Sequence, residues 1–310
     1  LRNLNRNKSH MNTINNQLTS GKEISRPSDN PYKVARSMQL SSDIKAATQY
    51  NENIKDTSNW LDTTDTALQQ IEGSLQRVRE LMVSAGSASY GVDEKRAIKD
   101  EINEKINEIA QVLNTTFDGK YIFGGTKVNS KPVISENNGV DNEIHYVDNL
   151  GNKITNLNDN KFLKQIGSSL DVEVSQGVTM KYNVSANEVL NFNDKNGNPI
   201  DVMSLLNDIT KNLDVNGNVT DLLGGNLKDV DATISNLLKL TSEVGAKQNR
   251  MESALEQNDE QIYNLKDILS KTEDIDFAEK TMEMTVAQTI YTAALQVSAS
   301  VIQPTLLDFL

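Results

Sequence analysis

The fold is decided by residues 234–269, ISNLLKLTSEVGAKQNRMESALEQNDEQIYNLKDIL. Seam positions alternate three and four residues apart along this tract for about five heptads, which is longer than the run that indicates a coiled coil. These positions are Ile234, Leu237, Thr241, Val244, Gln248, Met251, Leu255, Asn258, Ile262, Leu265 and Leu269. We predict one helix over 227–272, in which the polar seam residues Gln248 and Asn258 set the register at some cost in stability.

A second repeat lies in the N-terminal half of the chain. Apolar residues recur every seven positions from Ile54 to Met82, and a second line follows three positions later. Gly86 and Gly91 then interrupt the pattern before a further stripe begins at Ile98, which predicts two antiparallel helices joined by a short loop. The seam residues that we expect to hold the helical arms together are Ile54, Leu61, Leu68, Ile71, Leu75, Val78, Ile234, Leu237, Val244, Met251, Leu255, Ile262 and Leu265.

Proline and turn residues divide the chain. No proline falls in 33–131 or 200–303, and proline inside a helix costs about 3 kcal/mol. The segment between them contains Asn-Gly turns and strand-like runs at 143–147, 170–174 and 178–184. We therefore predict a mainly α protein with a β-rich insert: a long antiparallel helical coiled-coil rod formed by the N- and C-terminal arms, and a small β-rich middle domain.

These signals predict five parts. Residues 1–31 form a terminal helix and loop that pairs with 276–310, and residues 32–131 form the N-terminal half of the rod. The β-rich middle domain follows at 132–200. The C-terminal half of the rod covers 201–275, and a terminal helix covers 276–310.

Short apolar stripes lie at the two ends of the chain. A helix of fewer than about 15 residues is marginal alone, so each stripe needs a partner. Two interpretations remain open: the stripes pair within the chain, or the ends fold fully only in an assembly. The candidate assembly residues are Leu4, Met11, Ile14, Leu18, Val286, Ile290, Val297, Val301, Leu306, Leu307 and Leu310.

Composition excludes several classes of protein. The 310 residues include 31 Lys plus Arg against 43 Asp plus Glu, a net charge of −12 without a basic stripe, which argues against nucleic-acid binding. The chain has no cysteine, so disulfides and cysteine-ligated zinc are excluded. It has no run of about 18 apolar residues, so we expect no membrane insertion. Aromatic residues make up 5%, which favours an elongated protein that buries narrow seams.

Candidate catalytic and metal-binding residues are few. His10 and His145 are isolated in the sequence, and we interpret both as solvated or structural. Two stretches beginning at Asp194 and Asp214 resemble calcium loops, but neither has the glycine and glutamate that an EF-hand needs at its sixth and twelfth positions. We predict no enzyme activity, no metal and no cofactor.

Four stretches together resemble the bacterial flagellin superfamily. They are residues 17–31, 116–125, 243–251, and 276–279 with 306–310. Within the superfamily, the run Arg26-Pro27-Ser28-Asp29-Asn30-Pro31 is similar to that of the smaller hook–filament junction proteins. The family's sequences begin earlier than Leu1, so we expect a short segment to precede it.

The resemblance implies a secreted structural protein of the extracellular flagellum, forming a ring at the junction of hook and filament. It implies contacts with the larger hook-associated junction protein, with flagellin and with neighbouring copies, and an export chaperone on 276–310. Two alternatives remain open: a flagellin filament subunit, or a signalling or secretion-tip coiled-coil adaptor.

Overall fold

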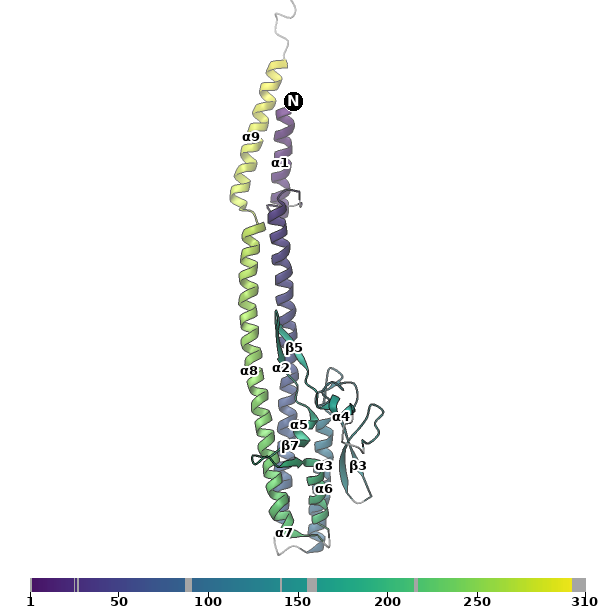
Figure 1. The fold of residues 1–310 in the computed structure, drawn as a ribbon. Helices are drawn as coiled ribbons and strands as arrows, with labels where there is room; N and C mark the ends of the chain where they lie inside the picture. Colours follow the sequence, from purple (N-terminus) through teal and green to yellow (C-terminus); the bar gives the residue numbers. More distant parts are fainter. Residues whose placement is uncertain are drawn as a thin grey trace, which may run out of the picture. The chain divides into compact units, whose positions relative to one another are not determined.

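The two longest helices of the described residues are α2 and α8 (Figure 1). Helix α2 spans Pro31–Ala85, and helix α8 spans Leu227–Glu273, which confirms the helix predicted over 227–272. The computed structural model describes residues 2–24, 26, 28–86, 91–139, 141–154, 161–214 and 217–302. The chain divides into two units, 1–49 with 258–310 and 50–257, and both long helices run through both units.

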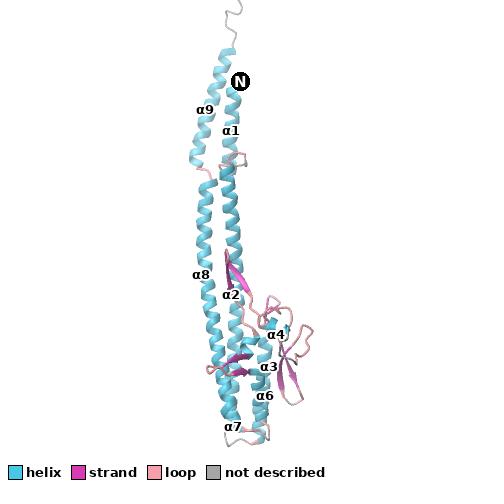
Figure 2. Ribbon diagram, in the orientation of Figure 1, coloured by secondary structure: helices cyan, strands magenta, loops and turns pink. Residues whose placement is uncertain are grey.

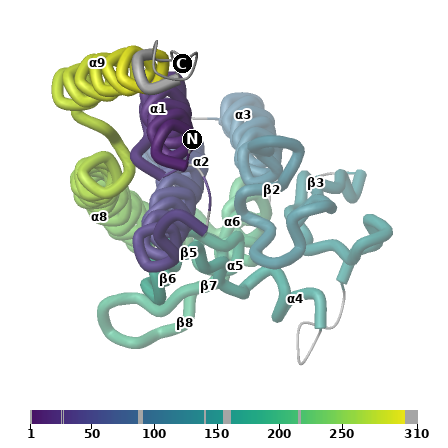
Figure 3. Tube along the Cα trace, turned by 90° about the horizontal axis from the view of Figure 1, so that it is seen from above, coloured from purple at the N-terminus to yellow at the C-terminus, as the bar shows by residue number. Residues whose placement is uncertain are grey.

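In the unit of residues 50–257, α2 buries a face that is wider than a coiled-coil seam. The predicted seam residues on α2 are all fully buried. A third buried line, which the sequence pattern did not indicate, consists of Trp60, Ala67, Ser74 and Leu81. A strip this wide requires neighbours on two sides of the helix. In Figures 1 and 3, α8 lies on one side of this part of α2 and α3, Val92–Leu113, on the other.

The seam of α8 is buried or half-buried along its length. Leu237, Val244 and Met251 are fully buried, and Ile234 and Leu255 are half-buried. Polar Gln248 donates from Nε2 to Oδ1 of Asp62 on α2 at 2.7 Å, a contact that supports one register of the two helices. In the other unit, the seam residues Ile262 and Leu265 are half-buried.

Helix α8 begins later than the predicted boundary of the C-terminal arm at 201. Residues before it form α6, Val202–Asn212, the single turn α7, Val219–Asp221, and a π-helical turn, η1, Leu222–Asn226. Asp201 caps α6 by accepting a hydrogen bond from the Met203 N–H. The apolar side of α6 joins the same core as α2, α3 and α8.

In the part of the chain that the structure describes, the strands form four separate antiparallel ladders of two strands (Figure 2). They are β1–β2 (Thr116–Phe117, Lys120–Tyr121), β3–β4 (Val133–Asn137, Asn142–Tyr146), β5–β6 (Asp171–Ser175, Val178–Lys181) and β7–β8 (Asn191–Asn193, Pro199–Asp201). The short helices α4, Lys161–Ile166, and α5, Ala186–Leu190, lie among them. The predicted runs at 143–147, 170–174 and 178–184 correspond to β4, β5 and β6. A two-stranded ladder is marginal alone, so these ladders bury their apolar sides in the core of the helices.

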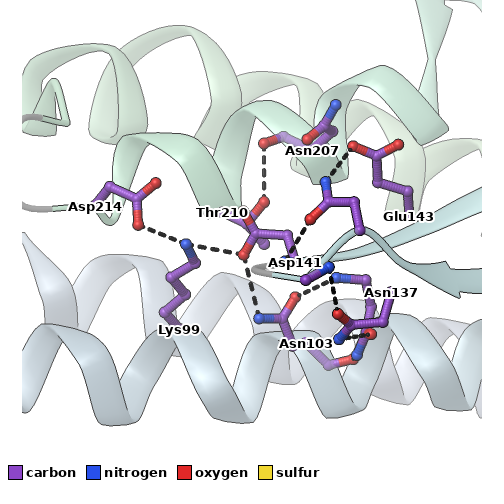
Figure 4. Close-up of polar contacts among 11 residues, drawn as sticks. Lys99, Asn103, Asn137, Asp141, Glu143, Asn207, Thr210 and Asp214 are labelled. Carbon is purple, nitrogen blue, oxygen red and sulfur yellow. Dashed lines mark hydrogen bonds and ion pairs between the residues drawn. The ribbon is translucent and has the colours of Figure 1, made fainter.

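A buried polar cluster attaches the β3–β4 hairpin to α3 (Figure 4). Nζ of Lys99 lies 2.9 Å from Oδ1 of Asp141 and 2.5 Å from Oδ1 of Asp214, and the Lys99 and Asp141 side chains are 8% and 6% exposed. Asn103 accepts from the Asn142 N–H at 3.0 Å. Burial opposes the charge on Lys99, but hydrogen bonds to Asp214 and Asp141 outweigh it and raise its pKa above the ordinary value. The lysine therefore stays charged, which makes both carboxylates necessary partners.

Candidate functional site: the terminal helix pair

The two ends of the chain pack together as an antiparallel helix pair. Helix α1, Arg2–Ser20, lies beside α9, Phe277–Ile302, in the unit of 1–49 with 258–310 (Figures 1 and 2). On α1, Ile14 is fully buried, and Leu4, Met11 and Leu18 are half-buried. The N-terminal stripe therefore has a partner within the chain.

The predicted stripe on α9 is largely exposed, although Val286 and Ile290 line a groove together with His10 of α1. Val286, Ile290 and Val297 are 58%, 50% and 62% exposed. The buried and half-buried side of α9 consists instead of Lys280, Glu283, Met284, Ala287, Tyr291, Ala294 and Ser298. Helices α1 and α9 therefore pair within the chain, and a role of Val286, Ile290 and Val297 in assembly stays a prediction. The side chain of Val301 and residues Leu306, Leu307 and Leu310 lie outside the described part of the chain.

Large apolar side chains therefore remain exposed along α9. This α9 apolar face consists of Met282, Val286, Ile290 and Val297, which helical spacing places on one side, whereas the exposed Phe277 and Leu295 lie on another side of the helix. A helix that is apolar on nearly all sides is normally buried on nearly all sides, yet α1 covers only one of them. Large apolar side chains that stay exposed along one side of a helix are typical of an interaction site.

The segment that follows α1, residues 21–23, hydrogen-bonds to the connection between α8 and α9, residues 273–275. The Ile275 N–H donates to the Gly21 carbonyl at 3.1 Å, and the Glu23 N–H donates to the Glu273 carbonyl at 2.6 Å. The Lys22 ammonium pairs with the Glu273 carboxylate. Gly21 has φ +73°, a conformation that glycine adopts without strain. Residues 21–23, which follow α1, are thereby attached to the connection between α8 and α9.

Asp276 caps the start of α9. Its Oδ1 accepts hydrogen bonds from the N–H groups of Ala278, at 2.9 Å, and Glu279, at 3.2 Å. These bonds satisfy donors that have no partner inside the helix, and the negative charge suits the positive end of the helix dipole.

Backbone geometry explains why residues 116–125 contain Asp118-Gly119 and Gly124-Gly125. Asp118 and Gly119 both have positive φ, +49° and +73°, as a tight hairpin turn between β1 and β2 requires. Gly124 and Gly125 lie where a Cβ atom would meet backbone carbonyl oxygens at 2.4 and 2.3 Å. Gly125 therefore permits a close approach of this loop to the end of α4, and Gly124 permits a tight turn against the carbonyl of Lys127.

The remaining polar candidates make local contacts. Oδ1 of Asp194 accepts from the N–H groups of Asn196 and Asn198, both at 2.8 Å, which closes a loop around Gly197. Nε2 of His145 lies 2.6 Å from Nζ of Lys153. Within the described ranges, no group of three or more His, Asp or Glu side chains is arranged to hold a metal ion. In the same ranges, no helix combines the length and apolarity that a membrane crossing requires.

The two ends of the chain match flagellin sequences. Residues 1–128 match the bacterial flagellin N-terminal helical region, and residues 227–310 match the bacterial flagellin C-terminal helical region. Flagellin of Bacillus subtilis (strain 168) is 27% identical over 276 residues, which cover 87% of this chain and 82% of that protein. Phase 1 flagellin of Salmonella naestved is 35% identical over 129 residues, which cover 42% of this chain and 25% of that protein.

Solved structures share the fold. A protein described as a flagellar hook-associated protein of Vibrio parahaemolyticus has a TM-score of 0.63 at 19% identity, covering 79% of this chain and 100% of that one. Hook-associated protein 3 of Legionella pneumophila has a TM-score of 0.60 at 14% identity, covering 77% and 98%. FlgL of Xanthomonas campestris has a TM-score of 0.59 at 16% identity, covering 73% and 98%. With both flagellin helical regions present at its two ends, the chain belongs to the bacterial flagellin family.

Proposed function

We propose that the chain is a structural subunit of the flagellum that forms the junction ring between hook and filament, as hook-associated protein 3 does, and that it is not an enzyme. The α9 apolar face carries the assembly part of this proposal, because a single chain leaves it uncovered. The fold likeness to solved hook-associated proteins, over nearly their whole lengths, supports the place in the junction.

Burial of the α9 apolar face supplies the free energy for docking. Each large apolar side chain contributes about 1.5–3 kcal/mol when fully buried, so four of them contribute roughly 6–12 kcal/mol before the cost of ordering. The proposed partners are neighbouring copies, flagellin on the filament side and the larger hook-associated junction protein on the hook side. Before assembly, an export chaperone covers 276–310. The place of action is the extracellular flagellum.

The test is complementation of a strain that lacks this gene. We expect the double variant Val286→Asp with Ile290→Asp to keep the helical content of the parent, because both side chains are exposed, but to fail to restore swimming. Gln288→Asp with Thr292→Asp places the same two charges at exposed polar positions of the same helix and serves as the matched control. Normal swimming with the double variant would show that this face is not used in assembly.

A flagellin filament subunit is the second candidate, favoured by the sequence relatives, which are flagellins. It predicts that purified protein added to filament seeds extends into long, sedimentable filaments, whereas a junction subunit does not. A coiled-coil adaptor, from another functional class, predicts a stable oligomer in isolation. Analytical ultracentrifugation distinguishes this from the monomer expected of an assembly subunit.

A further inference from the structure

A cavity of about 720 Å³ opens in the unit of residues 50–257. Its aromatic wall comes from three separate parts of the chain: Trp60 on α2, Phe117 on β1 and Tyr182, which follows β6. Asp56, Asp118 and Lys120 also line it. None of these residues belongs to the terminal helix pair, so the proposed assembly role does not account for the cavity.

The rings of Phe117 and Tyr182 each pack edge to face with Trp60. The Trp60 and Phe117 centroids are 6.1 Å apart with an interplanar angle of 75°, and the Trp60 and Tyr182 centroids are 5.7 Å apart at 87°. Trp60 is buried, whereas Phe117 and Tyr182 are only half-buried. Ring faces carry the negative part of the aromatic quadrupole and attract cations.

The charged groups at this cavity favour a cation. Asp56 and Asp118 are exposed, and neither makes an ion pair among the described residues. The positive φ of Asp118, at the tip of the β1–β2 turn, fixes the backbone from which its carboxylate extends. Lys120 opposes these charges, so two carboxylates and one ammonium leave the polar lining with a net negative charge.

We propose that this cavity binds an organic cation of the alkylammonium or guanidinium class, with the charge against the faces of Phe117 and Tyr182 and balanced by Asp56 and Asp118. Such a group is supplied by a free methylated amine or by a lysine or arginine side chain of another protein. The proposal is independent of the flagellar role.

The protein contains a single tryptophan, which lies in the cavity wall, so its fluorescence reports occupancy directly. The probe is choline, and the matched control ligand is its uncharged isostere 3,3-dimethyl-1-butanol. We expect a saturable change with choline at an affinity at least about tenfold above that of the isostere. No saturable change, or equal affinity for the two ligands, overturns the proposal. N-acetylarginine amide in a parallel titration identifies the source: tighter binding than choline indicates a protein side chain, and weaker binding indicates a free amine.

Variants separate a charged site from a merely apolar one. Asp118→Asn removes the charge but keeps a residue that tolerates positive φ, and we expect it to weaken choline binding at least about fivefold. Lys120→Met is expected to tighten binding. Asp100→Asn, at an exposed position on α3, is the matched control for loss of a carboxylate elsewhere. If Asp118→Asn, with unchanged circular dichroism, binds choline as Asp100→Asn does, the carboxylate has no role and the proposal fails.

Discussion

Replacement of Gly125 by alanine tests the explanation of the glycine pair. Gly125 has φ +58°, and a Cβ atom there would lie 2.3 Å from the carbonyl oxygens of both Gln165 and Ile166. Gly119 is the matched control, because it also has positive φ, +73°, but a Cβ atom added there would have no neighbour within 4 Å. The two substitutions therefore share the backbone strain and differ in the steric overlap.

The expected magnitudes follow from these two contributions. An alanine in the left-handed region costs about 1–2 kcal/mol at either position. Overlap with two backbone oxygens cannot be relieved by a side-chain rotation, so Gly125→Ala adds about 1–3 kcal/mol for the displacement of the backbone. We expect destabilisation of about 2–5 kcal/mol for Gly125→Ala and about 1–2 kcal/mol for Gly119→Ala.

Thermal unfolding measures the difference. Trp60 lies in the same unit as both glycines, so its fluorescence reports the unfolding of that unit. The two variants differ by the steric contribution of about 1–3 kcal/mol. At about 2–4 °C per kcal/mol for a unit of this size, Gly125→Ala should unfold roughly 2–12 °C below Gly119→Ala. Equal melting temperatures for the two variants would refute the steric explanation, because only the shared strain would then remain.

Three further predictions concern the polar cluster, one histidine and one glycine. Lys99→Met leaves the Asp141 carboxylate buried without an ion-pair partner, so chemical denaturation should show that the free energy of unfolding falls by about 3–5 kcal/mol. The control is Lys55→Met, at an exposed ion pair, which should change the free energy of unfolding by less than about 1 kcal/mol. Burial, together with Lys153, lowers the pKa of His145 below its ordinary value. Below pH 6.5 the unfolded chain then binds the proton more readily than the folded chain does, so the free energy of unfolding should fall as the pH drops towards the lowered pKa. In denaturation curves measured at a series of pH values, His145→Gln should flatten this dependence. Gly245→Ala on α8, where no atom would meet the added Cβ, should raise stability by about 1 kcal/mol, and an unchanged or lower denaturation midpoint would contradict this.

The helices and turns were predictable because their signals are local. The spacing of Leu237, Val244 and Met251 indicates both a helix and the side it buries, and these residues are fully buried. Asp276 stands directly before an apolar run and caps α9 through N–H groups two and three residues away. A tight hairpin turn likewise depends on neighbouring residues such as Asp118 and Gly119.

The candidate site was only half predictable. On α1, polar residues separate Leu4, Met11, Ile14 and Leu18, so the pattern identifies one apolar side, and that side is the one that lies towards α9. Helix α9 has apolar residues around most of its circumference, so several stripes fit its periodicity equally well. Which side meets α1 depends on how the two helices approach, and the selected side contains Ala287 rather than Val286.

By itself, the sequence determined the long helices, the hairpin turns and the two flagellin-like ends, because each depends on residues within a few positions of one another. The tertiary structure decided the third buried line on α2, the pairing of Lys99 with Asp141 and Asp214, and the side of α9 that stays exposed. These features join residues that are distant in the chain, and burial free energy, which depends on the neighbours that a folded chain brings together, selects among arrangements that the local pattern leaves equivalent.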